Sequence, residues 1–521
     1  MRKTTHSNLT TFALSTIVLA SCGKDPTSGG DSPLNANQFL VPLGTIPQLD
    51  LVFMIDNSPS MAPKQDKLRA QFPKLIDALK NPGDGSLPDL RIALIDSDLG
   101  TGGAYMVGPC GPKDANGTLT LGDEGKFQML GASDCGVTDA STLWLEYRNG
   151  APVNFTGDIQ SVFTCLAGNL GTLGCGFEQQ LQSYEFALKS TGLGNEAQQT
   201  MLRPGAYLGL VFLSDEDDCS ASMNFGIYGD KADARGESAS LRCATRAHAC
   251  DGKNLTSSPP GYPTVAAFEV PFASCAARTD ACPNGLDGNG AKDMDTSQPT
   301  SCSPLRSTSK LASEMKSLKK YPNEQVLVSG IFGLPLSDAD MATATYKIAP
   351  VPNPNSADTT HPTVFDSWPV CYDPNHPPVN PDPVTGFDSE AAGYGATGGL
   401  RMSAFVDEFG ANGQKFSICQ PDFTAAMSQI GATLSRKMRN QCVPTSYTQA
   451  AQCTAAYATP DGAQKAIPMC DADASESVVP CYTLVPDQNL CPGDANLVHL
   501  NRGSAATGQV PAGTWLVFSC P

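Results

Sequence analysis

An unbroken apolar run at 51–55 ends directly in the sequence Asp-Asn-Ser-Pro-Ser at 56–60. Apolar residues at every position predict a strand that is buried on both faces, as in a parallel sheet covered by helices. Open sheets of this kind bind ligands at the carboxyl ends of their strands. The turn therefore presents one carboxylate, Asp56, and two hydroxyls, Ser58 and Ser60, at the edge where a binding site forms.

These three side chains supply oxygen atoms, which are the ligands that hard divalent cations prefer. Mg²⁺ is the expected ion because it usually keeps several waters and needs few protein ligands, with Ca²⁺ and Mn²⁺ as alternatives. The motif alone is a weak pattern. The prediction of a metal site therefore depends on further ligands elsewhere in the chain.

A second continuous apolar run, at 207–213, predicts another buried strand, and Asp215 follows it closely. Because parallel strands end at the same edge of a sheet, we expect this carboxylate to lie near the first turn. Between the two strands, a glycine-rich loop at 166–176 contains Thr172. We take Thr172 as a ligand from a third loop, with Thr164 as a nearby competitor.

Asp56, Ser58 and Ser60, then a loop threonine, then a strand that ends near Asp215, resemble a von Willebrand factor type A domain with its metal-ion-dependent adhesion site. The resemblance implies that Ser58, Ser60 and Thr172 contact a divalent ion directly. It implies that Asp56 and Asp215 act directly or through water, and that one coordination position stays open for a carboxylate of a partner. The pattern covers under half of the chain.

Other interpretations of the same residues stay open. Ser58 and Ser60 are also favoured as caps of the helix predicted at about 61–79, although capping does not explain Asp215. The acids at 216–218 are interpreted as a solvated loop or a rim that selects ligands, in preference to a second ion site or an acid–base pair.

The amino terminus has the layout of a secretory signal, with an apolar stretch at 9–20 and small residues before Cys22. A cysteine at this position resembles the lipobox of bacterial lipoproteins, in which the cysteine is acylated and becomes the new amino terminus. We expect a signal peptide at 1–21, a lipid anchor on Cys22 and a flexible tether at 22–46. Gly23 in place of Asp favours the outer membrane, on its periplasmic or surface face. The alternative is an ordinary signal peptide cut elsewhere.

Cysteine usage independently indicates export. The chain has 19 cysteines, so an even number remains if Cys22 carries lipid, and such density is typical of an oxidising compartment. No Cys-x-x-Cys pair occurs and the histidines lack zinc-site spacing, so neither a zinc site nor a thiol redox motif is expected. Spacing does not determine connectivity, and the pairings Cys243–Cys250 and Cys275–Cys282 are guesses.

The net charge limits the range of partners. The formal charge of −18 becomes −20 when residues 1–21 are removed, because they carry Arg2 and Lys3 and no acid. A chain this acidic repels nucleic acid and anionic lipid headgroups, so we expect no nucleic-acid partner. An acidic partner group would be attracted only at the metal.

Strand and helix patterns alternate along 47–440, which predicts an α/β fold with a doubly wound, mostly parallel sheet of the von Willebrand factor A or Rossmann-like kind. Segments near 219–306 and 335–398 do not fit the alternation, and we interpret them as long disulfide-containing insertions. At 441–521, six cysteines among short polar segments indicate a small Cys-rich C-terminal module that ends in a strand at 514–518.

These features predict a membrane-anchored extracytoplasmic binding or adhesion protein that coordinates an acidic group of a protein or other partner through a divalent metal. The alternative is a structural envelope scaffold whose partners bind the insertions or the Cys-rich tail without metal. An enzyme is not expected, because the sequence has no Gly-x-Ser-x-Gly elbow and no Gly-x-x-x-x-Gly-Lys phosphate loop.

Overall fold

The structure is a computed structural model of the 521-residue chain. It describes residues 38–42, 47–82, 84–100, 122–190, 194–221, 243–244, 246–254, 274–282, 302–337, 348–352, 363–379, 388, 393–439, 442–444, 454–459, 463–470, 480–486, 495–501 and 514–519.

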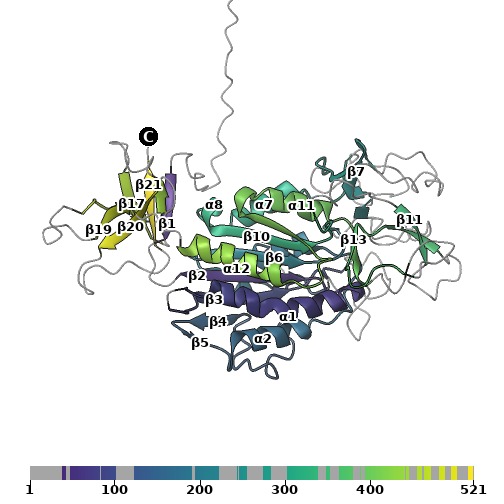
Figure 1. Ribbon diagram of the computed structural model, residues 1–521, viewed down its shortest axis with the longest axis horizontal. Coiled ribbons are helices and arrows are strands. Elements are labelled where there is room, and N and C mark those ends of the chain that lie inside the picture. The colour runs from purple at the N-terminus through teal and green to yellow at the C-terminus, as the bar shows by residue number, and fades with distance from the viewer. Residues whose placement is uncertain are drawn as a thin grey trace, which may run out of the picture.

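A seven-stranded sheet forms the centre of the molecule (Figure 1). Its strand order is β15-β10-β6-β2-β3-β4-β5. The strands from β15 to β3 run parallel, whereas β4 and β5 pair antiparallel at one edge. The strands are β2 (Gln48–Ile55), β3 (Asp89–Ile95), β4 (Leu145–Arg148), β5 (Ala151–Pro152), β6 (Tyr207–Leu213), β10 (Val326–Phe332) and β15 (Gly413–Ser417).

The strand β2 is apolar at successive positions because its side chains alternate between two cores. Leu51, Phe53 and Ile55 join the core on one face of the sheet. Val52 and Met54 join the core on the opposite face. Burial on both faces explains the unbroken apolar run, and it holds the turn after Ile55 on a rigid strand.

Helices cover both faces of the sheet (Figure 1). Helices α1, α2 and α12 pack on the first core, to which α2 contributes Phe163. Helices α3, α7 and α11 pack on the second core, to which α11 contributes Phe405. The helices are α1 (Ala62–Leu79), α2 (Ile159–Gly168), α3 (Gln180–Leu188), α4 (Glu196–Gln199), α7 (Thr308–Lys316), α8 (Pro322–Gln325), α11 (Leu400–Asp407) and α12 (Thr424–Arg439), with short 3-10 helices η1 (Pro59–Met61) and η7 (Gly410–Asn412).

The C-terminal part of the chain forms two antiparallel sheets, β1-β21-β17-β18 and β16-β20-β19, which share a small core (Figure 1). Strand β1 (Gln38–Pro42) pairs with β21 along its whole length. The predicted tether at 22–46 is therefore wrong at residues 38–42. Apolar residues such as Val41 are buried there, although Ser, Gly and Pro dominate the surrounding composition. The other strands are β16 (Cys442–Pro444), β17 (Thr454–Ala458), β18 (Gln464–Ala466), β19 (Cys481–Pro486), β20 (Ala495–Asn501) and β21 (Trp515–Ser519).

Short strands lie outside the main sheet in two segments of the chain. Between β6 and α7, strands β7 (His248–Cys250), β8 (Lys253–Asn254) and β9 (Cys275–Ala277) form one small sheet. Between β10 and α11, β11 pairs with β12 and β13 pairs with β14. These four strands are β11 (Ile348–Pro352), β12 (Thr363–Ser367), β13 (Cys371–Tyr372) and β14 (Gly395–Ala396).

The disulfides differ from the two guessed pairings, Cys243–Cys250 and Cys275–Cys282. Strands β7 and β9 pair antiparallel and place Cys250 directly opposite Cys275, which the sequence spacing does not reveal. Six disulfides join described residues: Cys135–Cys165, Cys219–Cys243, Cys250–Cys275, Cys282–Cys302, Cys371–Cys419 and Cys470–Cys481.

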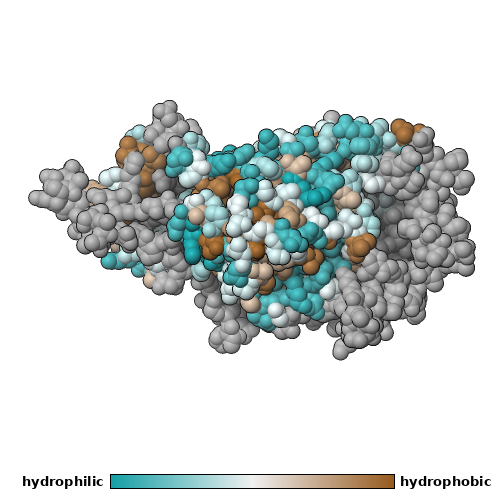
Figure 2. All heavy atoms as spheres, turned by 90° about the horizontal axis from the view of Figure 1, so that it is seen from below, coloured by the Kyte–Doolittle hydropathy of each residue, from teal (hydrophilic) through white to brown (hydrophobic). Residues whose placement is uncertain are grey.

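The surface seen in Figure 2 is mostly hydrophilic, with apolar residues scattered over it. Within the described residues, no helix has the length and apolar character that crossing a membrane requires. The predicted signal peptide at 1–21 and the lipidation residue Cys22 lie outside the described residues.

Candidate metal centre

The first part of the site is the turn that follows β2. The backbone N–H of Asp56 donates to the carbonyl of Leu213 (3.0 Å), so this turn is tied to the end of β6. The buried Asp56 carboxylate accepts bonds from the Ser58 N–H (2.8 Å), the Ser97 hydroxyl (3.1 Å) and the Ser214 hydroxyl (2.5 Å). Three different strand ends thus fix this carboxylate in one orientation.

The hydroxyls of Ser58 and Ser60 do not act as helix caps. Neither η1 nor α1 has a side-chain hydrogen bond at its N-cap, so the capping interpretation is not supported. The two hydroxyl oxygens lie 3.3 Å apart, and Ser60 Oγ donates to Asp215 Oδ1 at 3.1 Å. The structure therefore brings Asp56, Ser58, Ser60 and Asp215 together at the carboxyl ends of β2 and β6.

Thr172 lies in the loop between α2 and α3, which is held against the first turn. Gln65 Nε2 donates both to the Asp56 carbonyl (2.8 Å) and to the Gly171 carbonyl (3.0 Å). Gly174 approaches so closely that an added Cβ would lie 2.0 Å from the side-chain oxygen of Asn57. The loop is thus placed at the site, although within the described residues the Thr172 hydroxyl makes no hydrogen bond to the other four predicted ligands.

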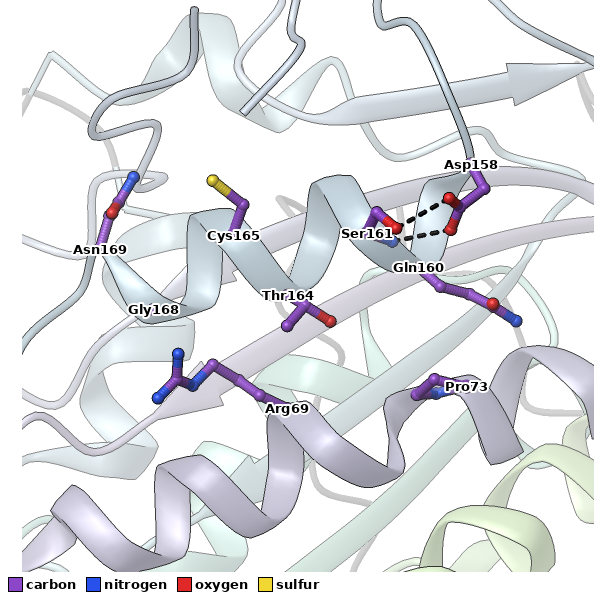
Figure 3. A pocket seen from close by; sticks show the side chains of 9 residues that line it. All are labelled: Arg69, Pro73, Asp158, Gln160, Ser161, Thr164, Cys165, Gly168 and Asn169. Atoms are coloured by element: carbon purple, nitrogen blue, oxygen red, sulfur yellow. Dashed lines mark hydrogen bonds between the residues drawn. The ribbon is translucent and has the colours of Figure 1, made fainter. Parts of the chain in front are cut away.

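The competitor Thr164 lies elsewhere. It belongs to helix α2 and lines an open groove of about 690 Å³ between α1 and α2, opposite Arg69 and Pro73 (Figure 3). Asp158 also lines the groove, at the start of α2. It accepts a hydrogen bond from the Ser161 N–H at 2.8 Å, so it caps this helix. The groove is therefore a separate feature, and Thr172 is the loop threonine near the first turn.

A lysine ammonium also lies inside the group. Lys64, from the start of α1, is only 2% exposed and forms an ion pair with Asp215 Oδ2. Its Nζ also donates to the carbonyl of Gly395 (2.9 Å) in β14 and to the carbonyl of Ser60 (3.3 Å). The sequence pattern did not predict a role for this lysine at the site.

Acidic side chains near the first turn influence one another. Burial raises the pKa of Asp56 to about 6, and the negative charge of Asp215 adds to the rise. Burial also raises the pKa of Glu178 well above its usual range, with the neighbouring Glu216 and Asp56 raising it further. The raised pKa values show that these buried acids lack enough positive charge to hold them ionised, although Lys64 pairs with Asp215.

Three residues near Asp56 were missed from the sequence. Ser97 and Ser214 follow β3 and β6 and donate to the Asp56 carboxylate, and Glu178 follows the Thr172 loop. Ser97 and Ser214 could have been predicted from the sequence, because they follow adjacent strands at the same carboxyl-end position as Asp56. No sequence pattern predicts that Glu178 lies near Asp56, because this depends on how the loop folds back.

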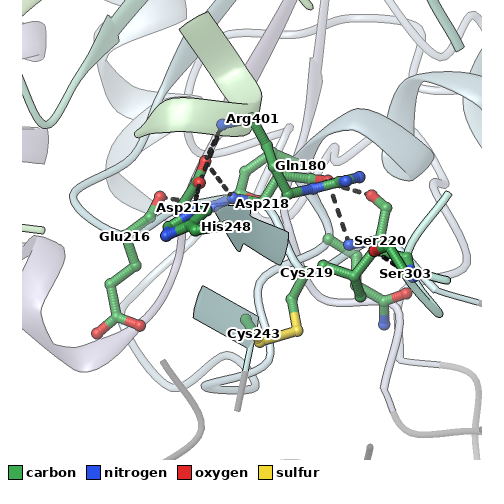
Figure 4. Close-up of a disulfide and its surroundings, with 12 residues drawn as sticks. Gln180, Glu216, Asp217, Asp218, Cys219, Ser220, Cys243, His248, Ser303 and Arg401 are labelled. Atoms are coloured by element: carbon green, nitrogen blue, oxygen red, sulfur yellow. Dashed lines mark hydrogen bonds and ion pairs between the residues drawn. A yellow bond between two sulfur atoms is a disulfide. The ribbon is translucent and has the colours of Figure 1, made fainter. Parts of the chain in front are cut away.

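The interpretation of the acids at 216–218 as a solvated loop is wrong for two of them. Asp217 and Asp218 are buried. Asp217 accepts from the Arg401 backbone N–H (3.0 Å) at the start of α11 and pairs with His248 (2.6 Å) (Figure 4). Asp218 accepts from the Leu181 N–H at α3 (3.0 Å) and pairs with the Arg401 guanidinium (2.9 Å). These acids anchor helices and do not form a rim.

The donor set of the site fits a hard divalent ion. Two carboxylates and two hydroxyls converge, with the Thr172 loop beside them, and a bound cation would favour the ionised form of the buried acids. Among the described residues, no group of three or more His, Cys, Asp and Glu side chains is arranged to hold a metal. An ion here would therefore depend on the hydroxyls and on water, as the predicted ligand set does.

No known protein family matches the sequence, and no curated protein does. Comparison with solved structures finds adhesive proteins of pili. They include SpaC of Lactobacillus rhamnosus GG in its open conformation (10% identity, TM-score 0.27, covering 91% of this chain and 39% of that one). They also include GBS104 of Group B Streptococcus agalactiae (14% identity, TM-score 0.25, covering 93% of this chain and 80% of that one). A third is RrgA of Streptococcus pneumoniae (12% identity, TM-score 0.22, covering 93% of this chain and 57% of that one). This chain spans well under two thirds of SpaC, and TM-scores this low carry no argument about function.

Proposed function

We propose that the chain is an extracytoplasmic binding protein of the von Willebrand factor A type that holds an acidic group of a partner through a divalent ion. Mg²⁺ is the proposed ion. The proposed ligands are Asp56, Ser58, Ser60, Thr172 and Asp215. When bound, the ion supplies a positive coordination position for a carboxylate of the partner.

The contact between Ser60 and Asp215 carries this proposal. Ser60 Oγ donates to Asp215 Oδ1 at 3.1 Å, although the two residues are 155 positions apart in the sequence. A hydroxyl and a carboxylate from the ends of two parallel strands thus meet beside Asp56, which is buried and, within the described residues, accepts hydrogen bonds from uncharged groups. Burial of a carboxylate without a directly bound cation is costly, and a metal ion would offset that cost.

The rest of the chain positions these groups. The Ser97 and Ser214 hydroxyls hold the Asp56 carboxylate, and Gln65 holds the Thr172 loop against the turn. Leu173, beside Thr172, is 83% exposed. An exposed apolar side chain at the edge of an ion site offers contact area to a partner, because burying it on binding is favourable.

Titration calorimetry of Mg²⁺ into the EDTA-stripped chain tests the metal site. We expect saturable binding of about one ion per chain, lost when Ser58→Ala and Ser60→Ala are combined. A matched control is Ser307→Ala with Ser309→Ala, because these hydroxyls form a similar pair, 2.9 Å apart, at the start of α7. The control should bind Mg²⁺ like the wild type.

Absence of Mg²⁺ binding in correctly oxidised wild-type protein would contradict the proposal. Partners would then have to bind the disulfide-containing insertions or the Cys-rich module without metal, as in the scaffold alternative. Binding that survives the Ser58 and Ser60 substitutions would contradict the ligand assignment while leaving a metal-dependent function in place.

We also propose that export ends with acylation of Cys22 and attachment to the cell envelope, at the outer membrane. The support is the sequence alone, since an apolar segment and small residues precede this cysteine. Incorporation of labelled fatty acid into the wild type, and its loss with release from membranes in Cys22→Ser, would support the proposal. A chain that stays membrane-bound after that substitution would contradict it.

A further inference from the structure

The Lys64 ammonium occupies a position that a cation would take in the proposed metal centre. It is buried, and lysine is rarely buried unless it is paired. Its partner is Asp215, one of the proposed ligands. The side chain starts one helical turn after Ser60, and its Nζ contacts the Ser60 carbonyl and Asp215, which follows β6.

Both oxygens of the Asp215 carboxylate are in use in this arrangement. Oδ1 accepts a hydrogen bond from the Ser60 hydroxyl, and Oδ2 accepts one from the Lys64 ammonium group. A divalent ion that uses this carboxylate, directly or through water, meets the ammonium at close range. Two like charges a few ångströms apart in a partly buried site repel strongly, so the ion and the ammonium compete for Asp215.

We infer that Lys64 is a tethered counter-ion of Asp215 and that a divalent ion must displace its ammonium group to load the site; this inference rests on the proposed function. The lysine holds the acidic site together while metal is absent. It also sets the metal concentration at which the site loads, because displacement reduces the affinity for the ion.

The Gly395 carbonyl supports this role for the lysine. This carbonyl accepts from Lys64 Nζ at 2.9 Å, and the N–H of Thr397 donates to the Asp215 carbonyl at 2.9 Å. Strand β14 and the residues after it therefore hold the ammonium and its carboxylate partner in one place. A flexible surface lysine would not compete in this way, because water would screen it and ordering it would cost entropy.

The test compares Lys64→Met with Lys67→Met in the full exported chain. Lys67 is a suitable control because it lies on the same helix and also pairs with a buried acid, Asp373, at 2.5 Å, with a further bond to the Gln420 carbonyl at 2.8 Å. Each variant removes one positive charge from an ion pair. The measurement is the dissociation constant of Mg²⁺ by calorimetry after EDTA stripping, with unfolding in urea to show that each variant is folded.

We expect Lys64→Met to bind Mg²⁺ at least tenfold more tightly than the wild type, and Lys67→Met to bind it within about twofold. Equal affinity in wild type and Lys64→Met would overturn it and leave the proposed function standing. Failure of both proteins to bind would overturn the proposed function itself, and the inference with it.

If Lys64→Met does not fold, Lys64→Gln takes its place, because its amide is a neutral hydrogen-bond donor where the ammonium group donates to the Gly395 carbonyl. The expected tightening is again at least tenfold. A weaker or unchanged affinity in Lys64→Gln would overturn the inference.

Discussion

Strand β2 carries a buried carboxylate near each end, and the two are stabilised in different ways. Asp50, near its start, accepts from the Arg203 backbone N–H (2.8 Å), from Arg203 Nε (2.8 Å) and from Lys319 Nζ (3.3 Å). Asp56, just after its end, accepts from a backbone N–H and from hydroxyls, and within the described residues no cation pairs with it. One acid has its own cations, whereas the other has hydrogen bonds alone.

This difference separates a structural acid from an acid available for function. Buried charges that serve the fold are paired, and Asp50 meets that rule with two cations from distant segments. At the other end of the strand, burial and the charge of Asp215 raise the pKa of Asp56 to about 6. An arrangement that leaves a buried acid short of positive charge at a strand end is typical of a ligand site.

The largest expected effect comes from Asp50→Asn. This change leaves Arg203 and Lys319 buried without their acid, so the free energy of unfolding should fall by about 3–5 kcal/mol. Unfolding in urea with and without Mg²⁺ measures it, and the loss should be the same in both conditions. A loss below about 1 kcal/mol would show that these cations find other partners, and the contrast with Asp56 would fail.

The same substitution at Asp56 should leave the stability of the metal-free protein unchanged and should remove its stabilisation by Mg²⁺. Asp56→Asn removes a negative charge near Asp215, so the metal-free protein should keep its stability. The stabilisation by Mg²⁺, about 2.7 kcal/mol at a concentration one hundred times the dissociation constant, should disappear. Urea unfolding across a Mg²⁺ series measures both quantities. Mg²⁺-dependent stabilisation that persists in this variant would remove Asp56 from the ligand set.

A smaller effect is expected from Gly174→Ala, which displaces only the Thr172 loop. It therefore tests the proposed metal site at Asp56 without changing the ion pairs of Asp50. The new Cβ would lie 2.0 Å from Asn57 Oδ1, so we expect a loss of about 1–2 kcal/mol in stability and weaker Mg²⁺ binding. Gly176→Ala is the control, since the nearest neighbour of its Cβ is 3.9 Å away. Equal Mg²⁺ affinity in the two variants would show that the loop contributes no ligand.

Individual elements of the main sheet were predictable because local pattern and burial agree there. The run at 51–55 and the run at 207–213 are strands in the structure, as β2 and β6, and the helix expected at about 61–79 is α1. The edge strands β4 and β5 and helix α2 were missed, because short or partly polar segments carry weak periodicity. Strand β1 was missed because its partner β21 lies at the other end of the chain, beyond any local signal.

Four of the five proposed ligands meet in the structure, because parallel strands end at one edge of the sheet and the sequence marks those ends. The residues around them were harder to predict. Lys64 and Glu178 reach the site through the start of a helix and a folded-back loop. Asp217 and Asp218 looked like a solvated acidic run, but their partners come from segments far along the chain. Side chains whose role depends on distant partners carry no local pattern.

The smallest effect is expected from Leu173→Ser, and it separates the fold from the ligand-facing edge of the site. A side chain that is 83% exposed contributes little buried area, so unfolding in urea should change by less than about 0.5 kcal/mol and the Mg²⁺ affinity should stay the same. Met469→Ser is the control, because Met469 is also exposed, at 53%, and belongs to the C-terminal module. A loss of stability above about 1 kcal/mol in Leu173→Ser alone would show that this leucine packs within the protein. The loop tip would then stabilise the fold, as Asp50 does, and would not be available to a partner.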